Sequence, residues 1–425
     1  MTMERAMNSP QVLRRINSEA VLRFALAKSA FGASEAMEAT GLTRSTVISL
    51  CEGLIELGWL EKLPNARTSG GGEYSKGRPA GRYRLRETSG HLVGIDAGQH
   101  TVTAVVADLR GKVLARETAA LADDGLDPAL RLEAAARTVH DALASCGVDA
   151  STVHATVIGV PAPVDLEGRS PDGHEHYWAT MNPGFADALP GLGRIVVDND
   201  ANLAATAERT LGAGVTSTSF AALLSGERFG AGLIVDDVLI RGRHGGAGEM
   251  RALDLVEGVG SAAGLAALAR DWAQEERLVG AIPPTSPLAR MPLAELTAAR
   301  VFEAAEAGDP GSIVIVRRLG ERLARICLVL ASLLDVERIV LVGALAASAG
   351  GVLEEARAVL RDEFYPPVPE LVASPLGADA VVLGAVARGL GLVRAEPLAF
   401  VPAGAAAGAA APAAAPAPAR ARARA

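Results

Sequence analysis

The chain has 425 residues, enough for two or three domains, and its 49% hydrophobic and 21% charged residues are typical of a globular protein. This composition excludes a wholly disordered chain. The cysteines, Cys51, Cys146 and Cys327, lie too far apart in sequence for a disulfide framework or a cysteine-rich zinc site. The N-terminus has no basic-then-apolar signal segment, and the Ala/Pro-rich C-terminus is too weakly apolar to span a membrane. We therefore expect a cytoplasmic protein with no membrane partner.

Charge is divided unevenly along the chain. Residues 1–90 hold 13 Lys and Arg against 9 Asp and Glu, whereas the rest of the chain holds 28 against 40. A basic N-terminal part on an acidic body is typical of a nucleic-acid-binding domain joined to a domain of another kind. An asymmetry of this size also arises by chance, so it needs support from motifs.

The sequence divides into four regions that differ in composition and in hydrophobic periodicity. Residues 11–63 have helical patterns, and residues 64–90 form a Gly/Ser/Arg-rich connector that ends in a strand-like alternation. Residues 91–395 alternate β-branched runs with helical patterns, which indicates an α/β domain. Residues 396–425 are of low complexity, rich in Ala and Pro, and we expect them to be disordered.

Residues 33–58 have the spacing of a helix-turn-helix. A short helix over about residues 34–40 ends at Gly41, and Thr43 is a natural N-cap for the next helix because its hydroxyl accepts a free backbone amide. Apolar residues at intervals of three or four then mark one face of that helix: Val47, Leu50, Cys51, Leu54 and Leu57. Met37 stands where a small residue usually lets the helices approach, and a small helical hairpin in an ordinary core remains the alternative.

The opposite face of the second helix is polar near its N-terminal end. In a helix-turn-helix this end enters the major groove, where short polar side chains and an arginine suit base edges and phosphates. The candidate DNA contacts on this helix are Thr43, Arg44, Ser45, Thr46 and Ser49. In the connector, Arg78 follows Gly77 and can reach a phosphate or the minor groove from a wing, the alternative being a flexible linker with incidental charge. We predict a winged helix-turn-helix over residues 11–86, with operator DNA as its partner.

The α/β region shows two series of elements. The predicted elements are, in order, strands at 91–96, 101–108 and 112–118, a helix at 128–146, strands at 153–160 and 194–198, a helix at 200–211, strands near 219–224 and 231–240, helices from about 262, a helix at 310–334, a strand at 338–342 and a helix at 379–393. Three strands, a helix and a strand, broadly repeated, are expected of a two-lobed actin/hexokinase-like (ribonuclease H-like) fold. The fold class is therefore α/β, preceded by the winged helix-turn-helix.

Five motifs occur in this region in a fixed order. They are Val93–Gly98, Gly159–Asp165, Asp198–Ala205, Gly245–Glu249 and Ile339–Gly343. Together with the N-terminal motif they resemble the regulators of the ROK family (repressors, open reading frames, sugar kinases). The resemblance spans residues 11–395, with a ROK domain over 91–395. Each motif alone is weak, but five in the right order are specific.

This resemblance implies a sugar-binding cleft between two lobes. Asn199 and Asp200 would hydrogen-bond sugar hydroxyls, and in the family's kinases the matching aspartate is the base that deprotonates the attacking hydroxyl. Glu249 would accept further hydroxyl hydrogen bonds, and Glu257 falls where the family has another sugar-contacting glutamate. Gly159 would let the sugar approach the backbone. For each acidic residue a helix-capping or surface role is the alternative, and capping competes most strongly at Asp200.

Departures from the family's kinases predict that ATP does not bind. The first phosphate loop, Asp-x-Gly-Gly-Thr in the kinases, is Asp96–His100 here, and the second, Gly-Thr-Gly-x-Gly-x-Gly, is Gly226–Gly232. In the second loop Glu227 would set a carboxylate against the phosphates, which costs several kcal/mol in an enclosed site. The adenosine-side Gly-Gly is Gly343-Ala344. We therefore expect no catalytic residue and no cofactor.

The family's zinc site is also missing from the sequence. Its cysteine motif is absent, and the histidine that normally follows the Gly-Glu pair is replaced by Ala252. His174-Glu175-His176 has the residue types of a metal pair, but its spacing beside Pro and Gly favours an exposed loop. We expect no bound metal.

These observations predict a cytoplasmic transcriptional regulator, more specifically a repressor. Its winged helix-turn-helix would bind operator DNA, and an inactive sugar-kinase-like domain would sense a sugar or a sugar derivative. Paired DNA-binding domains imply a homodimer or homotetramer. Two alternatives remain open: an active sugar kinase, and a DNA-binding regulator whose α/β domain dimerises it without binding sugar.

Overall fold

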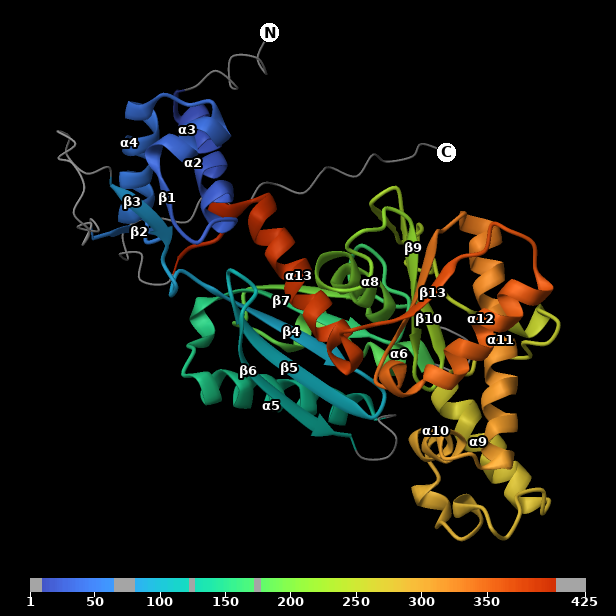
Figure 1. The fold of residues 1–425 in the computed structure, drawn as a ribbon. Helices are drawn as coiled ribbons and strands as arrows, with labels where there is room; N and C mark the ends of the chain where they lie inside the picture. Colours follow the sequence, from blue (N-terminus) through green and yellow to red (C-terminus); the bar gives the residue numbers. More distant parts are fainter. Residues whose placement is uncertain (1–9, 65–80, 122–126, 172–176, 403–425) are drawn as a thin grey trace, which may run out of the picture. The chain divides into compact units, whose positions relative to one another are not determined.

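The computed structural model describes residues 10–64, 81–121, 127–171 and 177–402 (Figure 1). The chain divides into two compact units, Met1–Ser89 with Val401–Ala425, and Gly90–Phe400. We call the described residues up to Ser89 the head and Gly90–Phe400 the body. Each is considered by itself.

The head combines three helices with a small antiparallel sheet in the described residues. The helices are α2 (Pro10–Leu26), α3 (Ala33–Thr40) and α4 (Arg44–Glu56). The strands are β1 (Phe31–Gly32), β2 (Leu60–Leu63) and β3 (Arg82–Leu85), in the order β1-β3-β2. This is a winged helix-turn-helix.

Two of these strands lie in a region whose pattern predicted helix. Residues 31–32 and 60–63 are extended because β3, from beyond the connector, pairs with both of them. Phe31 lies opposite Tyr83, and Leu60 lies opposite Leu85. Because their pairing partner lies far away in the sequence, strands of only two and four residues have no local pattern that predicts them.

The helix-turn-helix has the predicted caps. Gly41 ends α3 with a φ of 69°, a left-handed conformation that glycine adopts without strain. Thr43 has an extended backbone, and its Oγ1 accepts a hydrogen bond from the amide of Thr46 at 3.4 Å. The buried face of α4 consists of Val47, Leu50, Cys51 and Leu54. Leu57, expected on that face, is 41% exposed because α4 ends at Glu56.

The body contains two five-stranded sheets of the same topology in its described residues. The first has the order β6-β5-β4-β7-β8 and the second β11-β10-β9-β12-β13. In each, three antiparallel strands are followed by two parallel ones. The strands of the first sheet are β4 (His91–Ala97), β5 (Thr101–Asp108), β6 (Val113–Ala120), β7 (Val153–Val160) and β8 (Arg194–Asn199). Those of the second are β9 (Phe220–Ser225), β10 (Phe229–Val235), β11 (Val238–Ile240), β12 (Arg338–Val342) and β13 (Glu370–Ala373).

Helices cover these sheets and separate them. The helices are α5 (Pro128–Cys146), α6 (Tyr177–Met181), α7 (Phe185–Ala188), α8 (Asp200–Leu211), α9 (Leu265–Leu278), α10 (Ala298–Glu306), α11 (Pro310–Leu334), α12 (Gly350–Glu363) and α13 (Ala380–Ala395). Helix α5 packs on β5 and β6, whereas α8 and α13 pack on each other, α13 against β4 and β7 and α8 against β9 and β10 (Figure 1). We call the first sheet with α5–α7 the first lobe, and the second sheet with α9–α12 the second lobe.

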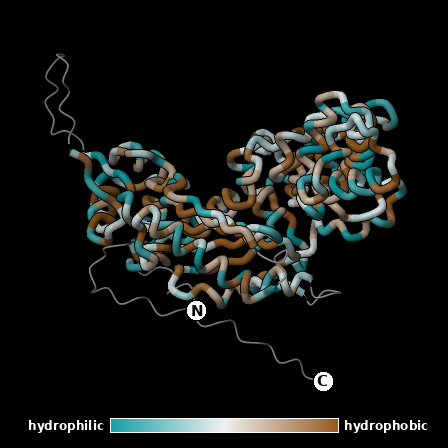
Figure 2. Tube along the Cα trace, turned by 90° about the horizontal axis from the view of Figure 1, so that it is seen from below, coloured by the Kyte–Doolittle hydropathy of each residue, from teal (hydrophilic) through white to brown (hydrophobic). Residues whose placement is uncertain are grey.

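Close packing of α8 on α13 depends on a glycine. A Cβ at Gly384 of α13 would lie 1.8 Å from the backbone oxygen of Leu203 in α8. Separate hydrophobic clusters fill each lobe, and a third lies around these two helices. Figure 2 shows hydrophobic stretches along the central part of the body. The α8–α13 pair therefore packs closely between the two sheets of the body.

Three predictions for the body differ from the structure. The strand expected at 231–240 is divided into β10 and β11 by a turn in which Asp236 and Asp237 have φ values of 50° and 63°. Helix α12 and strand β13 were not predicted, because α12 starts with two glycines and β13 has four residues. The folded body also continues past 396, where the tail was expected to begin. Pro397–Ala399 form a 3-10 helix, and the Phe400 ring lies 5.4 Å from that of His154.

No helix in the described part of the chain is long and apolar enough to cross a membrane. Residues 403–425, most of the expected tail, lie outside the described residues.

Candidate functional site

The candidate DNA contacts of the head gather at the N-terminal end of α4. Arg44, Ser45 and Ser49 are exposed, and Thr46 is half-buried. The Thr43 Oγ1 lies 2.8 Å from Thr46 Oγ1 and 3.2 Å from Ser45 Oγ, so these hydroxyls form one cluster. Thr43 therefore caps the helix and also orients its neighbours. Arg78 of the predicted wing lies outside the described residues.

A cavity of about 580 Å³ lies between the two lobes of the body. It is lined by the loop after β4, the start of α6, the β8–α8 junction, the β9–β10 turn, the loop after β12 and the start of α13. Three of the predicted sugar contacts, Asn199, Asp200 and Glu249, line it. The fold thus brings together residues from positions 50 apart in the sequence.

Two predicted sugar contacts lie elsewhere. Gly159 is buried in β7, where a Cβ would lie 2.7 Å from Val381 Cγ1 and 3.0 Å from Leu203 Cδ1. Its lack of a side chain therefore serves the packing of α13 and α8, not the approach of a ligand. Glu257 is exposed in the loop after the 3-10 helix Arg251–Leu255 and does not line the cavity. The structure therefore does not bring these two residues to the cavity lined by Asn199, Asp200 and Glu249.

Asn199 and Asp200 have different structural roles at the start of α8. Asn199 is the N-cap, since its Oδ1 accepts from the amide of Asn202 at 3.1 Å, while its Nδ2 donates to the Ala162 oxygen at 3.1 Å. The capping role considered for Asp200 therefore belongs to Asn199. Asp200 accepts a hydrogen bond from the amide of Ala201 at 2.7 Å. Its carboxyl group lines the cavity.

Three half-buried carboxyl groups share the cavity, and each has a raised pKa. Burial raises the pKa of Asp96 to about 7, against the opposing effect of Arg131 and Arg116. Burial, followed by the neighbouring Asp96, raises the pKa of Asp200 well above its usual value. Burial also raises the pKa of Glu249. A raised pKa favours the protonated carboxyl group, which donates as well as accepts hydrogen bonds and so suits the hydroxyls of a sugar.

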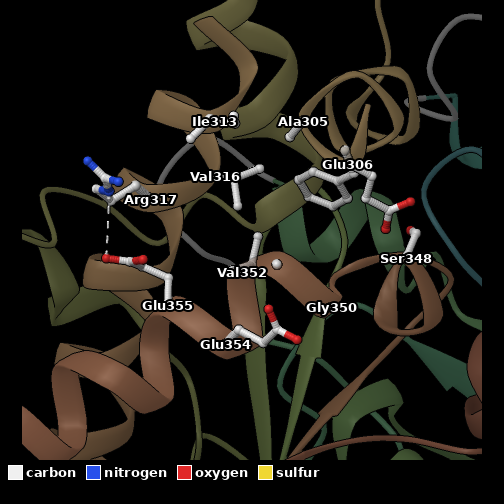
Figure 3. Close-up of a pocket in the computed structure, with 12 residues that line it drawn as sticks. Ala305, Glu306, Ile313, Val316, Arg317, Ser348, Gly350, Val352, Glu354 and Glu355 are labelled. Carbon is white, nitrogen blue, oxygen red and sulfur yellow. Dashed lines mark ion pairs between the residues drawn. The ribbon is translucent and has the colours of Figure 1, made fainter. Parts of the chain in front are cut away.

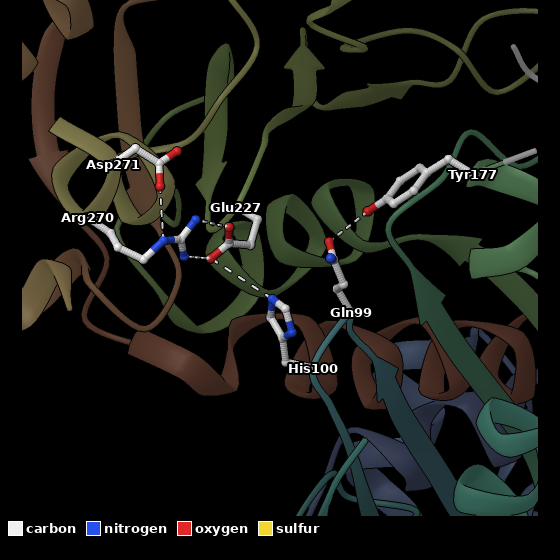
Figure 4. A network of polar contacts seen from close by, with 6 residues as sticks. All are labelled: Gln99, His100, Tyr177, Glu227, Arg270 and Asp271. Carbon is white, nitrogen blue, oxygen red and sulfur yellow. Dashed lines mark hydrogen bonds and ion pairs between the residues drawn. The ribbon is translucent and has the colours of Figure 1, made fainter. Parts of the chain in front are cut away.

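The β9–β10 turn holds a fourth carboxylate in a different state. Glu227 forms a bidentate pair with Arg270 of α9, with distances of 2.9 and 3.0 Å, and its Oε1 lies 4.0 Å from His100 Nε2 of the first lobe (Figure 4). The hydrogen bond from Arg270 lowers the pKa of Glu227. An ionised carboxylate therefore lines the cavity at the loop where the family's kinases have glycines.

Aromatic side chains of α6 face arginines of the second lobe. The guanidinium of Arg228 lies 5.8 Å from the Tyr177 ring, and that of Arg251 lies 4.5 Å from the Trp178 ring. The Tyr177 hydroxyl donates to Gln99 Oε1 at 3.1 Å (Figure 4). The two arginine–aromatic contacts join the lobes, whereas the Tyr177–Gln99 hydrogen bond holds α6 to the loop after β4 within the first lobe.

Sequence reasoning missed a buried arginine beneath the cavity. Arg131 of α5 is fully buried and donates to the backbone oxygens of Ala97, Gly98 and Met181 at 2.7, 2.9 and 3.3 Å. It thereby ties the loop after β4 to the end of α6. In the sequence Arg131 is one arginine in an amphipathic helix, and no pattern separates it from the exposed ones.

Metal ligands do not gather in this part of the molecule. Among the described residues, no group of three His, Cys, Asp or Glu side chains could hold a metal ion. His174-Glu175-His176 lie outside the described residues.

A second cavity, of about 410 Å³, lies between α10, α11 and α12 (Figure 3). Its walls are apolar around Val316 and Val352, with Arg317 and Glu355 paired at 3.9 Å on its edge. None of the predicted site residues lines it.

Comparison with known proteins places the body in a family. The model of the ROK family matches residues 92–388, and the chain belongs to this family. A model of the IclR helix-turn-helix domain matches residues 21–64, which lie in the head. Both parts of the chain therefore have recognisable relatives.

Two named relatives that align with more than three quarters of this chain are regulators. The xylose repressor of Caldicellulosiruptor bescii is 24% identical over 405 residues, which cover 90% of this chain and 97% of that repressor. The DNA-binding transcriptional dual regulator NagC of Escherichia coli is 25% identical over 346 residues, covering 78% and 81%. A glucokinase of Halalkalibacterium halodurans is 27% identical over 208 residues, which cover 45% of this chain and 62% of the glucokinase.

A solved structure supports the same fold. A ROK family transcriptional regulator, described as a homologue of the E. coli MLC protein, matches with a TM-score of 0.67 at 20% identity. The match covers 91% of this chain and 99% of that one.

Proposed function

We propose that this chain is a sugar-responsive repressor: the head binds operator DNA, and the body binds a sugar or sugar derivative that changes the affinity of the head. One observation carries the proposal. A single chain combines an exposed, N-capped α4 with a cavity lined by carboxyl groups of raised pKa. The xylose repressor and the dual regulator NagC, which align with most of this chain, support it.

On the DNA side, the N-terminal end of α4 enters the major groove. Arg44 contacts a phosphate or a guanine edge, and Ser45 and Ser49 contact neighbouring groups from the same exposed face. Thr43 and Thr46 contribute to DNA binding indirectly, because their hydrogen-bonded hydroxyls hold the N-terminal end of α4 in place. Arg78 adds a wing contact, which is inferred from the sequence alone.

On the sugar side, Asp200 at the start of α8 and Glu249 beside β10 bind hydroxyl groups. Asn199 offers its second amide N–H, because the hydrogen bonds to Ala162 and Asn202 leave that proton unused. Tyr177 and Trp178 provide flat apolar surface beside these groups.

Within this proposal the body does not transfer phosphate. Asp200 has the raised pKa of a general base, which is the feature that favours an active sugar kinase. However, Glu227 lines the same cavity in the turn that corresponds to the second phosphate loop of the family's kinases, and its side chain, paired with Arg270, occupies space there. ATP-dependent phosphorylation of any hexose by the purified chain would overturn this part of the proposal.

Regulation requires coupling between ligand and DNA. A sugar changes operator affinity only to the extent that its own affinity differs between the conformation that binds DNA and the conformation that does not. We propose a homodimer or homotetramer, whose paired heads bind a near-palindrome with half-sites about 34–36 Å apart.

A gel-shift titration on the DNA upstream of its own gene, at fixed salt, tests the function. We expect specific binding that a pool of sugars weakens. Specific binding that no pool alters would favour the alternative in which the body serves dimerisation. Absence of specific binding would contradict the proposed function.

A further inference from the structure

The cavity is larger than the group of proposed sugar contacts. Asp200 and Glu249 line its part beside α8 and β10, and Glu249 is bridged to Gly230 of β10. Another part is lined by Ala344 after β12 and by Ala378 before α13. Both parts belong to one cavity of about 580 Å³. A single sugar ring held by Asp200 and Glu249 leaves the second part unfilled.

The walls of this second part have small side chains, a paired arginine and one acid, Asp96, which lies opposite Thr103 in the β4–β5 pair and has a pKa raised by burial to about 7. Thr103 and Thr118 line it with hydroxyl groups 3.1 Å apart. Arg116 is paired with Asp379 at 2.7 Å. The side chains of Ala344 and Ala378 are exposed methyl groups that leave room for a ligand. Hydroxyls beside methyl groups suit a polar ligand without charge.

The charges of the whole cavity disfavour an anion. Its described lining contains the carboxyl groups of Asp96, Asp200, Glu227 and Glu249, against the guanidinium groups of Arg116 and Arg228 and the imidazole of His100. Arg116 is paired with Asp379, and Glu227 is paired with Arg270, so these charges largely compensate one another. Arg228 lies over the Tyr177 ring. The burial that raises the pKa of Asp96, Asp200 and Glu249 also disfavours the negative charge of a phosphate at the same place.

We propose that the ligand of the body is an uncharged glycoside of at least two rings and not a sugar phosphate. One ring is bound by Asp200 and Glu249, and the next extends between Ala344 and Ala378 toward the Thr103 and Thr118 hydroxyls. The proposal rests on the proposed function, because it takes the Asp200–Glu249 part as the sugar site.

The test is ligand-induced thermal stabilisation of the full-length protein. The probes are xylose, glucose and N-acetylglucosamine, their β-1,4-linked dimers, maltose, glucose 6-phosphate and N-acetylglucosamine 6-phosphate. A ligand that binds the native state raises Tm according to its concentration relative to Kd. We expect one disaccharide to bind at least tenfold more tightly than its monosaccharide, and each phosphate at least tenfold more weakly than its parent sugar.

A pair of variants locates the second ring. In Ala344→Phe the new side chain fills the second part, so disaccharide affinity should fall at least tenfold while monosaccharide affinity stays unchanged. Ala347→Phe is the matched control, since Ala347 is also exposed and does not line the cavity. We expect both variants to fold, because each side chain points to solvent or to the cavity.

The possible results separate this inference from the proposed function. A phosphorylated sugar that binds most tightly, or equal affinity for monosaccharide and disaccharide, would overturn the inference and leave a sugar sensor. Equal losses in Ala344→Phe and Ala347→Phe would overturn the placement of the second ring. If no probe stabilises a protein that binds its operator, both the inference and the sugar-sensing part of the proposed function fail.

Discussion

The head and the body place their candidate functional residues in opposite physical settings. Arg44 and Ser49 lie on the exposed face of one helix, whereas Asp200 and Glu249 line a cavity built from two lobes. A residue on an exposed face contributes little to stability, so its replacement changes binding alone. A carboxyl group within a cavity is desolvated, so its replacement changes stability and binding together. The predictions below test this separation.

The largest effect is expected for the buried arginine beneath the cavity. Arg131→Met removes the donor to the backbone oxygens of Ala97, Gly98 and Met181, and buried unpaired acceptors cost about 1–3 kcal/mol each, so unfolding free energy should fall by about 3 kcal/mol or more. Chemical unfolding measures this value.

Arg137→Met on the same helix is its control. Arg137 is exposed and pairs with Glu133 at 3.4 Å on the surface, and such pairs contribute about 0–1 kcal/mol. If both variants lose the same unfolding free energy, the buried hydrogen bonds of Arg131 stabilise the body no more than a surface ion pair does.

In the head, Arg44→Ala should weaken operator binding by roughly 1–3 kcal/mol, because it removes a contact to base or phosphate. Its Tm should stay within experimental error of the parent, since Arg44 is exposed. Arg15→Ala on α2, also exposed and paired with Glu19 at 3.2 Å, is the control. Gel-shift titrations at one salt concentration measure both, and unchanged affinity in Arg44→Ala would remove this residue from the interface.

In the body, Asp200→Ala should weaken sugar binding about tenfold or more, which corresponds to about 1.4 kcal/mol, because it removes the group that hydrogen-bonds the sugar hydroxyls. Glu257→Gln should bind sugar as the parent does, since Glu257 is exposed and lies outside the cavity. Calorimetric titration with a stabilising sugar gives both affinities. A loss in Glu257→Gln would restore that residue to the site.

A further effect is expected in the pH dependence of stability. The pKa of Asp96 is raised to about 7 by burial, so the folded state holds this proton more tightly than the unfolded chain. Asp96 therefore lowers stability progressively as pH rises from about 4 to about 7. Asp96→Asn should be more stable than the parent at pH 8, and this gain should vanish near pH 4. Thermal unfolding across this range measures it, and a gain independent of pH would contradict the assigned cause.

The contrast between one exposed helix in the head and a cavity built from distant segments in the body also explains how much could be predicted from the sequence. The face of α4 and its Thr43 cap follow from spacing of three or four residues, which is local information. The order of strands and the Asp200 position follow from local patterns and motifs. The role of Arg131, the exposure of Glu257 and the packing role of Gly159 depend on contacts between distant segments, such as that between β7 and α13. No local pattern contains that information.

The central claim is that one chain couples a sugar site in the body to DNA binding by the head. The most direct measurement is the sugar affinity of the full-length protein with and without saturating operator DNA, beside the operator affinity with and without saturating sugar. Linkage requires the two ratios to be equal. We predict that operator weakens sugar binding by the same factor, about 5–150-fold, as sugar weakens operator binding. A sugar affinity that operator DNA leaves unchanged would contradict the account.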